Sequence, residues 1–394
     1  MTWQRFCFEP LDTLFFRDGR PFDQNDDGMA DAVSVFPPNP SVLIGALRAA
    51  AARGRGWVDG TDWCGSAAED GTSIDTVLGN GPNDLGQLSF SAPILLRSDR
   101  QNGDRWERLY LAPSHVVEKQ SAVGDSVEYR LLAPKMNRRL DCDIGAGVAL
   151  PHVSERGFGL HDGVLWLDHA GMQAVLEGRP PMPDNTVPQT LIYQLERRIG
   201  LARDNDRRSA RRGQLYVMSK LRFGDRDERF ALGIDVSGLP TGKVDWHPKG
   251  LHPIGGKRRL VEVTAIDGAS GHSLRKAPQA AGGLYTIVLT GPALMPATAS
   301  WNEVDGEIPG MPGRIVSACI GRPRGIGGWD GRKTDTGSLG ATAMTFALEA
   351  GSTWFMALAP EETLDDLPQA LGERGRAGFG EFAVGQWPQG DLQS

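Results

Sequence analysis

The sequence predicts an α+β protein with two domains, and three observations support this fold class. The chain has 394 residues, more than one ordinary core holds, so we expect two domains of about 150–200 residues each. Hydrophobic residues make up 40% of the chain and charged residues 23%, as in soluble globular proteins. Both halves also show the same order of elements: a strand, a helix, several strands, a second helix and a final strand.

Composition limits the environment of the protein. The four cysteines are scattered without a C-x-x-C pair, so we expect no zinc ribbon and no disulfide framework, which fits a reducing cytoplasm. The N-terminus has no apolar signal core and the chain has no run of 18 apolar residues, so we expect no membrane association. The net charge of −7 argues against a protein that coats nucleic acid through bulk charge.

The first half opens with a predicted strand from Phe6 to Phe16. A turn with two arginines, Arg17 and Arg20, follows it, and a polar acidic stretch leads to the segment Phe36 to Ala52. Three prolines in that segment hold the approach extended. We therefore expect Ser41 to cap a helix that starts at Val42.

This predicted helix carries two residues that a buried helix does not require. Gly45 costs about 0.5–1 kcal/mol relative to alanine inside a helix, so we expect either a ligand or a neighbouring strand to approach the backbone there. Arg48 lies about one turn further on. Free N–H groups at the helix start, a bare backbone patch and a guanidinium suit a phosphate; a core helix is the alternative.

The next region is predicted to contain an insertion and a projecting arm. Residues 53–82 are rich in Gly and Asp and read as irregular, and Gly86 to Leu96 reads as a strand. Asn102-Gly103 is a strong hairpin signal before a strand at Trp106 to Leu111. Residues 98–146 have many basic and few aliphatic side chains, so we predict a hairpin arm that grips a partner, or else a solvated loop.

The end of the first half has a clear helix signal. Gly163 to Leu167 reads as a strand, and Asp168 is expected to cap a helix through Leu176. Prolines crowd the segment Arg179 to Pro188, and we place the domain boundary near Pro180–Val187. The predicted domains are residues 1–185 and residues 186–394.

The second half is predicted to be rich in strands. Leu215 to Phe223 and Arg229 to Val236 read as a pair of strands, and Leu364 to Leu371 as a short helix. Further strands are expected at Leu260–Ile266, Gly283–Leu289, Arg314–Ile320, Thr342–Leu348, Thr353–Leu358 and Glu381–Val384. The order of elements in each half is the split β-α-β pattern of a ferredoxin-like domain.

Motifs of common enzymes and cofactor sites are missing. The seven histidines form no H-x-x-x-H or H-E-x-x-H pattern, and neither a nucleophile elbow nor a phosphate-binding P-loop is present. The glycine segments lack the spacing of dinucleotide fingerprints, and the carboxylate clusters read as solvated charge. We therefore expect no catalytic residues, no metal and no cofactor.

Glycine beside arginine recurs instead. Such segments occur at Arg17–Arg20, Gly255–Arg259, Gly321–Gly325 and Arg374–Gly378. Glycine lets a backbone approach a bulky anion, and arginine offers a phosphate fork and a flat face for a base. Seven arginines also lie between Arg197 and Arg212. Each segment alone could be an ordinary surface turn; together they favour single-stranded RNA as the ligand.

Several of these segments form a specific pattern. The opening Pro10–Phe22 followed by Phe36–Ser41 is the strongest part. Further agreement comes from Glu196–Gly200 with Gly213–Tyr216, Ile320–Pro323 with Gly327–Asp330, and Gly378–Gly380. In these residues the chain resembles, nearly end to end, the third Cmr subunit of type III-B CRISPR effector complexes, in the RRM-like RAMP superfamily. Lys257 departs from the pattern, which has an acidic residue there.

The resemblance implies a fold and a role in antiviral defence. The fold would be two ferredoxin-like (RRM-like) domains with a projecting β-hairpin thumb. The protein would hold the 5′ repeat-derived tag of the CRISPR RNA without cutting RNA, and would meet target RNA indirectly. Its protein partners would be the large palm-domain subunit and the repeating backbone subunit. The predicted RNA-binding residues are Arg17, Arg20, Ser41, Gly45, Arg48, Arg197, Arg322, Arg374, Gly375, Arg376 and Gly378.

Two alternatives remain at this stage. A metal-independent endoribonuclease that processes CRISPR RNA would need a general acid and base, for which His115 and His152 are the candidates. A scaffold that touches only protein is the other alternative. RNA that copurifies with the complex discriminates the RNA-binding subunit from the scaffold.

Overall fold

The computed structural model describes residues 2–17, 30–61, 71–99, 105–120, 126–135, 140–142, 145–161, 163–224, 228–240, 245–268, 274, 281–334 and 337–388. The fold is α+β, with many strands and few helices, and its sheets are mostly antiparallel. The chain forms two compact units. Unit 1 contains residues 1–106, 190–269 and 325–345; unit 2 contains residues 107–189, 270–324 and 346–394. Each unit takes segments from both halves of the sequence. The predicted division into two ferredoxin-like domains, 1–185 and 186–394, stays a prediction.

Unit 1 is built on an antiparallel sheet in the order β4-β16-β1-β18-β17. The first strand of the chain lies in the middle, and both its faces are buried, since Phe6, Cys7 and Phe8 are each at most 1% exposed. Helix α1 packs against β17. The elements are β1 (Trp3–Pro10), β2 (Ala30–Val33), α1 (Pro40–Arg53), α2 (Ile74–Leu78), β3 (Ser89–Phe90), β4 (Ile94–Asp99), β14 (Tyr193–Asp204), β15 (Ser209–Phe223), β16 (Glu228–Ser237), β17 (Gly250–Ile254), β18 (Arg259–Ile266), β22 (Trp329–Thr334) and β23 (Gly337–Ala341).

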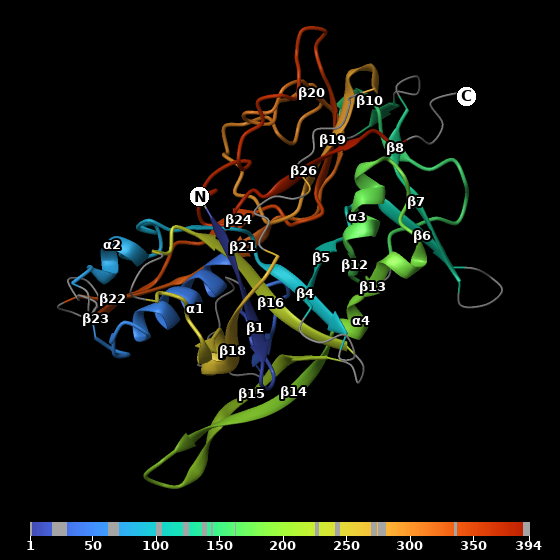
Figure 1. Cartoon of the computed structure of the whole chain (residues 1–394). Helices are drawn as coiled ribbons and strands as arrows, with labels where there is room; N and C mark the ends of the chain where they lie inside the picture. The colour runs from blue at the N-terminus through green and yellow to red at the C-terminus, as the bar shows by residue number, and fades with distance from the viewer. Residues whose placement is uncertain are drawn as a thin grey trace. The chain divides into compact units, whose positions relative to one another are not determined.

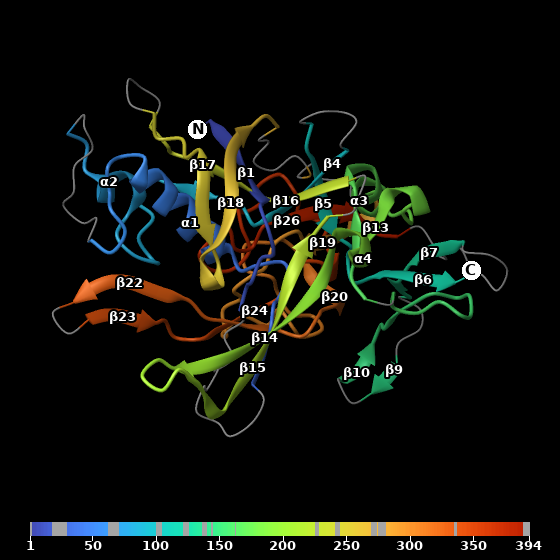
Figure 2. The same ribbon diagram turned by 90° about the horizontal axis from the view of Figure 1, so that it is seen from below.

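A long two-stranded ribbon extends from unit 1. Strands β14 and β15 form it, and Figure 1 shows it reaching well beyond β1, β16 and β18. Strand β15 also pairs in parallel with β2. The predicted pairing of Leu215–Phe223 with Arg229–Val236 is therefore wrong: β15 pairs with β14 and β2, while β16 pairs with β1, β3 and β4. A second, shorter hairpin of this unit joins β22 and β23 (Figure 2).

Unit 2 is built on an antiparallel sheet in the order β20-β25-β19-β26. Alternation along β19 sends Tyr285, Ile287 and Leu289 into one core cluster and Val288 into another, so this sheet is covered on both faces. The elements are β5 (Glu107–Leu111), β6 (Val116–Gln120), β7 (Val127–Leu131), β8 (Ala133–Pro134), β9 (Leu140–Cys142), β10 (Gly145–Val148), β11 (Pro151–His152), β12 (Leu165–Leu167), α3 (His169–Leu176), β13 (Thr186–Pro188), β19 (Leu284–Leu289), β20 (Arg314–Cys319), β25 (Thr353–Ala357) and β26 (Phe382–Gln386).

Short elements complete the chain. Helix α4 spans Gln189–Ile192, and strands β21 (Arg324–Ile326) and β24 (Thr345–Ala347) pair with each other. Three 3-10 turns lie at Pro183–Asn185, Gly256–Arg258 and Ala281–Gly283. No helix among the described residues is long and apolar enough to cross a membrane.

The predicted arm at residues 98–146 needs correction. Its described residues form β5, the β6–β7 hairpin and the β9–β10 hairpin. Tyr110, Val116 and Tyr129 join a core cluster with Met172 and Val175 of α3. A few large side chains at alternating positions suffice to anchor a hairpin, so this region buries more of itself than its composition suggests. Asn102-Gly103 lies outside the described residues.

Two smaller predictions also differ from the structure. Residues 364–371 form bends instead of a helix, because Pro368 removes a backbone donor and clashes with the preceding turn. The segment 53–82 is not wholly irregular, since it contains α2. By contrast α3 begins after Asp168, whose Oδ1 accepts a hydrogen bond from the Gly171 backbone N at 2.8 Å, which confirms the predicted cap.

Candidate functional site

The start of α1 is capped by Asn39. Its Oδ1 accepts hydrogen bonds from the Ser41 backbone N at 3.2 Å and from Ser41 Oγ at 3.3 Å. The Val42 backbone N donates to the Asn39 carbonyl at 2.9 Å, and Pro40 has no N–H to offer. The prediction that Ser41 caps a helix from Val42 is therefore wrong by two residues. The donors of Ser41 and Val42 are occupied inside the chain, so the helix start is a weaker anion site than the sequence implies.

Gly45 lies on the exposed side of α1. A Cβ built there meets no described atom within 4 Å, whereas Leu43 and Leu47 on the other side are fully buried. A close helix–strand contact, one of the two predicted reasons for this glycine, is therefore excluded for the described residues. The bare backbone patch that a ligand could approach is present.

Arg48 is only 5% exposed, and its guanidinium faces the loop that follows α2. Arg48 Nη2 donates to the Gly79 carbonyl at 2.8 Å and to the Asp84 carbonyl at 3.1 Å, and Nη1 donates to the Gly81 carbonyl at 2.8 Å. Burial lowers the pKa of Arg48 to about 10, which leaves it charged at neutral pH. This side chain holds a loop in place, and the predicted contact with a phosphate does not fit its position.

The ribbon root is joined to the segment before α1 by aromatic packing. Phe36 meets Tyr193 and Phe223 edge-on, with ring centroids 5.1 and 5.4 Å apart, and Tyr193 pairs with Phe223 across the ladder. The prolines that follow Phe36 lead from this contact to the capped start of α1. The ribbon and the helix are thus anchored to the same aromatic cluster.

One face of the ribbon is apolar and exposed. Leu195, Ile199 and Leu201 are 53%, 73% and 52% exposed, and the predicted site residue Arg197 is exposed among them. These residues share a face because side chains alternate along a strand. Arg197 is therefore accessible to a ligand, as the sequence predicts.

The opposite face of the ribbon carries a group of positive charges that is not among the predicted RNA-binding residues. Glu196 and Lys220 lie directly opposite each other in the β14–β15 ladder, and alternation places Arg198 and Arg222 on the same face. Arg222 Nε donates to Glu196 Oε2 at 2.6 Å, and its Nη2 donates to Asp12 Oδ1 at 3.1 Å. We call Arg198, Lys220, Arg222 and Arg259 the cationic cluster.

Ion pairs tie the cationic cluster to two carboxylates. Arg198 pairs with Glu196, and Arg259 Nη1 lies 3.6 Å from Asp12 Oδ2. Hydrogen bonds from Arg222 and Arg198 lower the pKa of Glu196, and the Thr13 backbone N–H and Arg222 lower the pKa of Asp12. Both carboxylates are therefore ionised at neutral pH. The signal in the sequence is the repeated pattern of Glu196-x-Arg198 and Lys220-x-Arg222, which becomes informative only once the two strands are paired.

The loop beside the cationic cluster packs on the segment that ends at Arg17. The Gly256 backbone N donates to the Phe15 carbonyl at 2.8 Å, and a Cβ on Gly255 would lie 2.7 Å from the same oxygen. Lys257 has φ +59° and its Nζ lies 5.9 Å from the centre of the Tyr216 ring. Arg17 is exposed, as predicted for an RNA contact, whereas Arg20 lies outside the described residues.

The remaining predicted residues belong to unit 2. Arg322, Arg374 and Arg376 are exposed. Arg374 has φ +59°, lies 5.4 Å from the centre of the Phe379 ring, and has its pKa lowered by burial. The loop around Gly375 and Gly378 is closed by backbone hydrogen bonds, including Leu371 N to Gly380 O at 2.9 Å. Its glycines first of all allow this tight turn.

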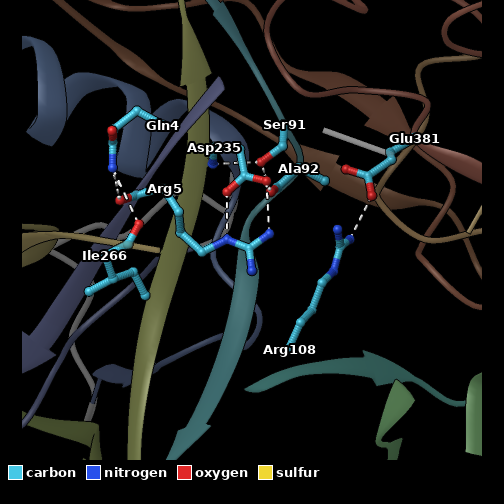
Figure 3. Close-up of polar contacts among 8 residues, drawn as sticks. All are labelled: Gln4, Arg5, Ser91, Ala92, Arg108, Asp235, Ile266 and Glu381. Carbon is cyan, nitrogen blue, oxygen red and sulfur yellow. Dashed lines mark hydrogen bonds and ion pairs between the residues drawn. The ribbon is translucent and has the colours of Figure 1, made fainter. Parts of the chain in front are cut away.

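Other arginines serve the cores, as Figure 3 shows. In unit 1, Arg5 donates two hydrogen bonds of 2.6 and 2.8 Å to the carboxylate of Asp235, and the backbone N of Asp235 donates to Ser91 Oγ at 2.9 Å. In unit 2, Arg108 Nη2 donates to Glu381 Oε1 at 2.6 Å. The first pair is buried and the second is largely buried, so basic residues in this chain divide into structural and exposed groups.

The histidine candidates for RNA cleavage do not form a pair suited to catalysis. His115 is 1% exposed, its Nδ1 lies 3.1 Å from Thr353 Oγ1, and burial lowers its pKa to about 3. His152 Nδ1 lies 3.4 Å from the Leu150 carbonyl. Within the part of the chain that the structure describes, no three His, Cys, Asp or Glu side chains gather in a way that could hold a metal ion.

The comparisons with known proteins identify the family. A family model described as "CRISPR-associated protein (Cas_Cmr3)" matches residues 6–387. The protein is therefore a CRISPR-associated protein. The chain belongs to the Cas_Cmr3 family, which confirms the resemblance to the third Cmr subunit. No curated protein matches the chain.

Solved structures of one type of complex are similar to the chain. Chains in the cryo-EM structures of type III-B Cmr-beta bound to cognate target RNA and AMPPnP (state 1), and to cognate target RNA, share 14% and 15% identity with it, at TM-scores of 0.47 and 0.46. Each alignment covers 89% of this chain and 86% of the other. A chain in the apo state shows 10% identity and a TM-score of 0.28, and the alignment covers 67% of this chain and 97% of that one.

Proposed function

We propose that this protein is a non-catalytic, RNA-binding subunit of a type III-B CRISPR ribonucleoprotein. It holds the 5′ repeat-derived tag of the CRISPR RNA and bridges the large palm-domain subunit to the repeating backbone subunit. It meets target RNA only through the guide. The observation that carries the proposal is the family match over residues 6–387, and the accessible arginines of both units support it.

The proposed RNA contacts are revised by the geometry. The exposed arginines of the prediction can pair with phosphates; they are Arg17, Arg197, Arg322, Arg374 and Arg376. Gly45 offers open backbone. The proposal also keeps their neighbours in the sequence, Arg20, Ser41, Gly375 and Gly378. We leave Arg48 out of the proposed contacts because three carbonyls occupy its guanidinium.

The proposed fold follows the same family. Residues 1–185 and 186–394 would each descend from a ferredoxin-like (RRM-like) domain. An exposed hairpin serves as the thumb that grips a partner. We now assign the thumb to the β14–β15 ribbon, because this ribbon reaches beyond the sheet of unit 1 (Figure 1). The ribbon also carries the exposed Arg197.

Sequencing of the RNA that copurifies with the assembled complex tests the proposal. A uniform 5′ end that begins in the repeat supports tag binding, and a complex assembled without RNA contradicts it. The variant Arg197→Ala should lower guide occupancy, while Arg179→Ala, which removes an exposed arginine paired with Glu177 in unit 2, should not.

Incubation of the purified chain with a labelled repeat RNA in EDTA tests the non-catalytic part. We expect no cleavage product. The endoribonuclease alternative needs an accessible acid and base, and burial of His115 removes one of its two candidates.

A further inference from the structure

The cationic cluster carries more charge than the chain neutralises around it. Arg198, Lys220, Arg222 and Arg259 supply four positive charges, and their ion pairs lead to two carboxylates, Asp12 and Glu196. Each carboxylate is shared by two arginines: Glu196 by Arg198 and Arg222, and Asp12 by Arg222 and Arg259. A surplus of two positive charges is left where this face of the ribbon meets Asp12 and Arg259.

Lys220 is the centre of this imbalance. It is 7% exposed and lies opposite Glu196 in the ladder, yet its ammonium makes neither a hydrogen bond nor an ion pair with any described residue. Burial and the charges of Arg259 and Arg198 lower its pKa, and the smaller opposing effects of Asp12 and Glu196 do not restore it. An ammonium group held in these conditions is destabilised until an anion arrives.

Arg259 adds a second group without an acceptor. Its Nε is buried and has no hydrogen-bond partner in the described structure, while its Nη1 reaches Asp12 only at 3.6 Å. Buried donors are rarely left unpaired. The charge of Arg259 in β18 acts on Lys220 in β15, and the ammonium of Lys220 and the Nε of Arg259 both lack an acceptor. Two such donors match the several oxygens of one phosphate group.

We propose that the cationic cluster is a phosphate-binding site and that Lys220 is its central ligand. The site takes one phosphate group, which the two surplus charges neutralise. The identification of that phosphate as part of an RNA backbone rests on the proposed function; the binding of the phosphate group itself does not. The carboxylates of Asp12 and Glu196 keep the arginines in place and discourage a second phosphate.

Thermal unfolding of the full chain with inorganic phosphate tests the site. Phosphate replaces chloride at constant ionic strength, so that general screening does not change. At ten times its Kd, phosphate should raise the melting temperature of the unmodified protein by about 2 °C. Lys220→Met keeps the buried stem and should abolish the rise. Lys249→Met is the matched control, since Lys249 is an exposed lysine of the same unit, and it should retain the rise.

The loss of the phosphate effect in Lys220→Met cannot be explained by a failure of the variant to fold. Lys220→Met removes a charge that burial destabilises, so its melting temperature without phosphate should equal or exceed that of the unmodified protein. An equal rise with phosphate in Lys220→Met and in the unmodified protein would overturn the proposal. Absence of any rise in the unmodified protein would overturn it as well.

Binding of single-stranded RNA separates this proposal from the proposed function. Lys220→Met should weaken binding about tenfold for a tag sequence and for a scrambled sequence alike, because a phosphate contact is independent of sequence. The slope of log K against log salt should fall by about 0.7. Equal affinity of the unmodified protein for the two sequences would contradict tag recognition but leave the phosphate site intact. Unchanged affinity and slope in Lys220→Met would overturn the RNA assignment of the site.

Discussion

Arg48 and Lys220 are both buried basic residues, yet their surroundings assign them opposite roles. Arg48 gives its donors to three carbonyls of one loop, and Asp84 nearby favours its charge. Around Lys220 the charges of Arg259 and Arg198 outweigh those of Asp12 and Glu196. A buried cation that is held by several carbonyls supports the fold, whereas a buried ammonium without any acceptor is a candidate for binding.

The role of Arg48 can be measured through stability. Arg48→Ala leaves the carbonyls of Gly79, Gly81 and Asp84 without their donor and should lower the free energy of unfolding by about 2–4 kcal/mol. Arg48→Lys should recover only part of this, because an ammonium cannot reproduce the planar fork. Urea unfolding gives both values. A stable Arg48→Ala protein that has lost guide RNA would instead restore the original phosphate assignment.

Gly45 offers a second prediction at this scale. Gly45→Ala should raise the free energy of unfolding by about 0.5–1 kcal/mol, since the new methyl group meets open space in a helix. Gly171→Ala in α3 is the control and should destabilise the protein, because its Cβ would lie 2.9 Å from the Asn185 carbonyl. Denaturant curves of both variants decide whether Gly45 is kept for a reason other than stability. A loss of stability in Gly45→Ala would show that something packs there.

At the scale of elements, α1 depends on its cap. Asn39→Ala should cost about 1 kcal/mol of stability, because the side chain of Asn39 accepts from both the backbone N and the hydroxyl of Ser41. Ser41→Ala should change stability much less, since Ser41 only donates its hydroxyl here. Thermal unfolding of the two variants compares them directly. The reverse order of effects would place the cap at Ser41 after all.

Elements with strong local signals could be predicted from the sequence. The helix after Asp168, the helix of α1 and most strands of both units were found, because caps and periodicity act over a few residues. The pairing of β15 was not, because the choice between β14 and β16 depends on long-range packing. The burial of region 98–146 could not be predicted from its composition. Val116 and Tyr129 pack into a core cluster, so a few well-placed side chains bury the region despite its few aliphatic residues.

The candidate site was predictable only where a residue's role depends on its own sequence neighbours. Exposure of Arg17 and Arg197 follows from polar surroundings. The cationic cluster and its two paired carboxylates come from four separate segments, which contain Asp12, Glu196, Lys220 and Arg259. No local spacing relates these segments. Arg48 was misassigned for the same reason: the carbonyls that bind it belong to a loop more than 30 residues later.

At the scale of the whole molecule, His115 should make stability depend on pH. Its pKa is about 3 in the folded protein and 6.5 in the unfolded chain. Between these two pH values the unfolded chain binds a proton at His115 that the folded protein does not bind. The contribution of neutral His115 to the free energy of unfolding is therefore fully present above pH 6.5 and is lost as the pH falls. The slope from this group approaches about 1.4 kcal/mol per pH unit.

Urea unfolding from pH 6.5 to 4.5 measures this dependence. The variant His115→Gln has no titrating ring and should show a shallower slope over this interval by nearly that amount. The difference between the slopes of the two proteins gives the contribution of His115 alone, because the carboxylates contribute equally to both slopes. Identical slopes would mean that His115 is protonated in the folded protein.

The central position of β1 has a consequence for synthesis of the chain. Its partners β16 and β18 come much later, and the Arg5–Asp235 pair spans 230 residues. At about 5–20 residues per second on a ribosome, both hydrogen-bonding edges of this apolar strand wait on the order of 10–50 s before they are covered. During that time the nascent N-terminus is a natural client for a chaperone that shields strand edges. A truncated translation product that ends before residue 228 would aggregate rather than fold.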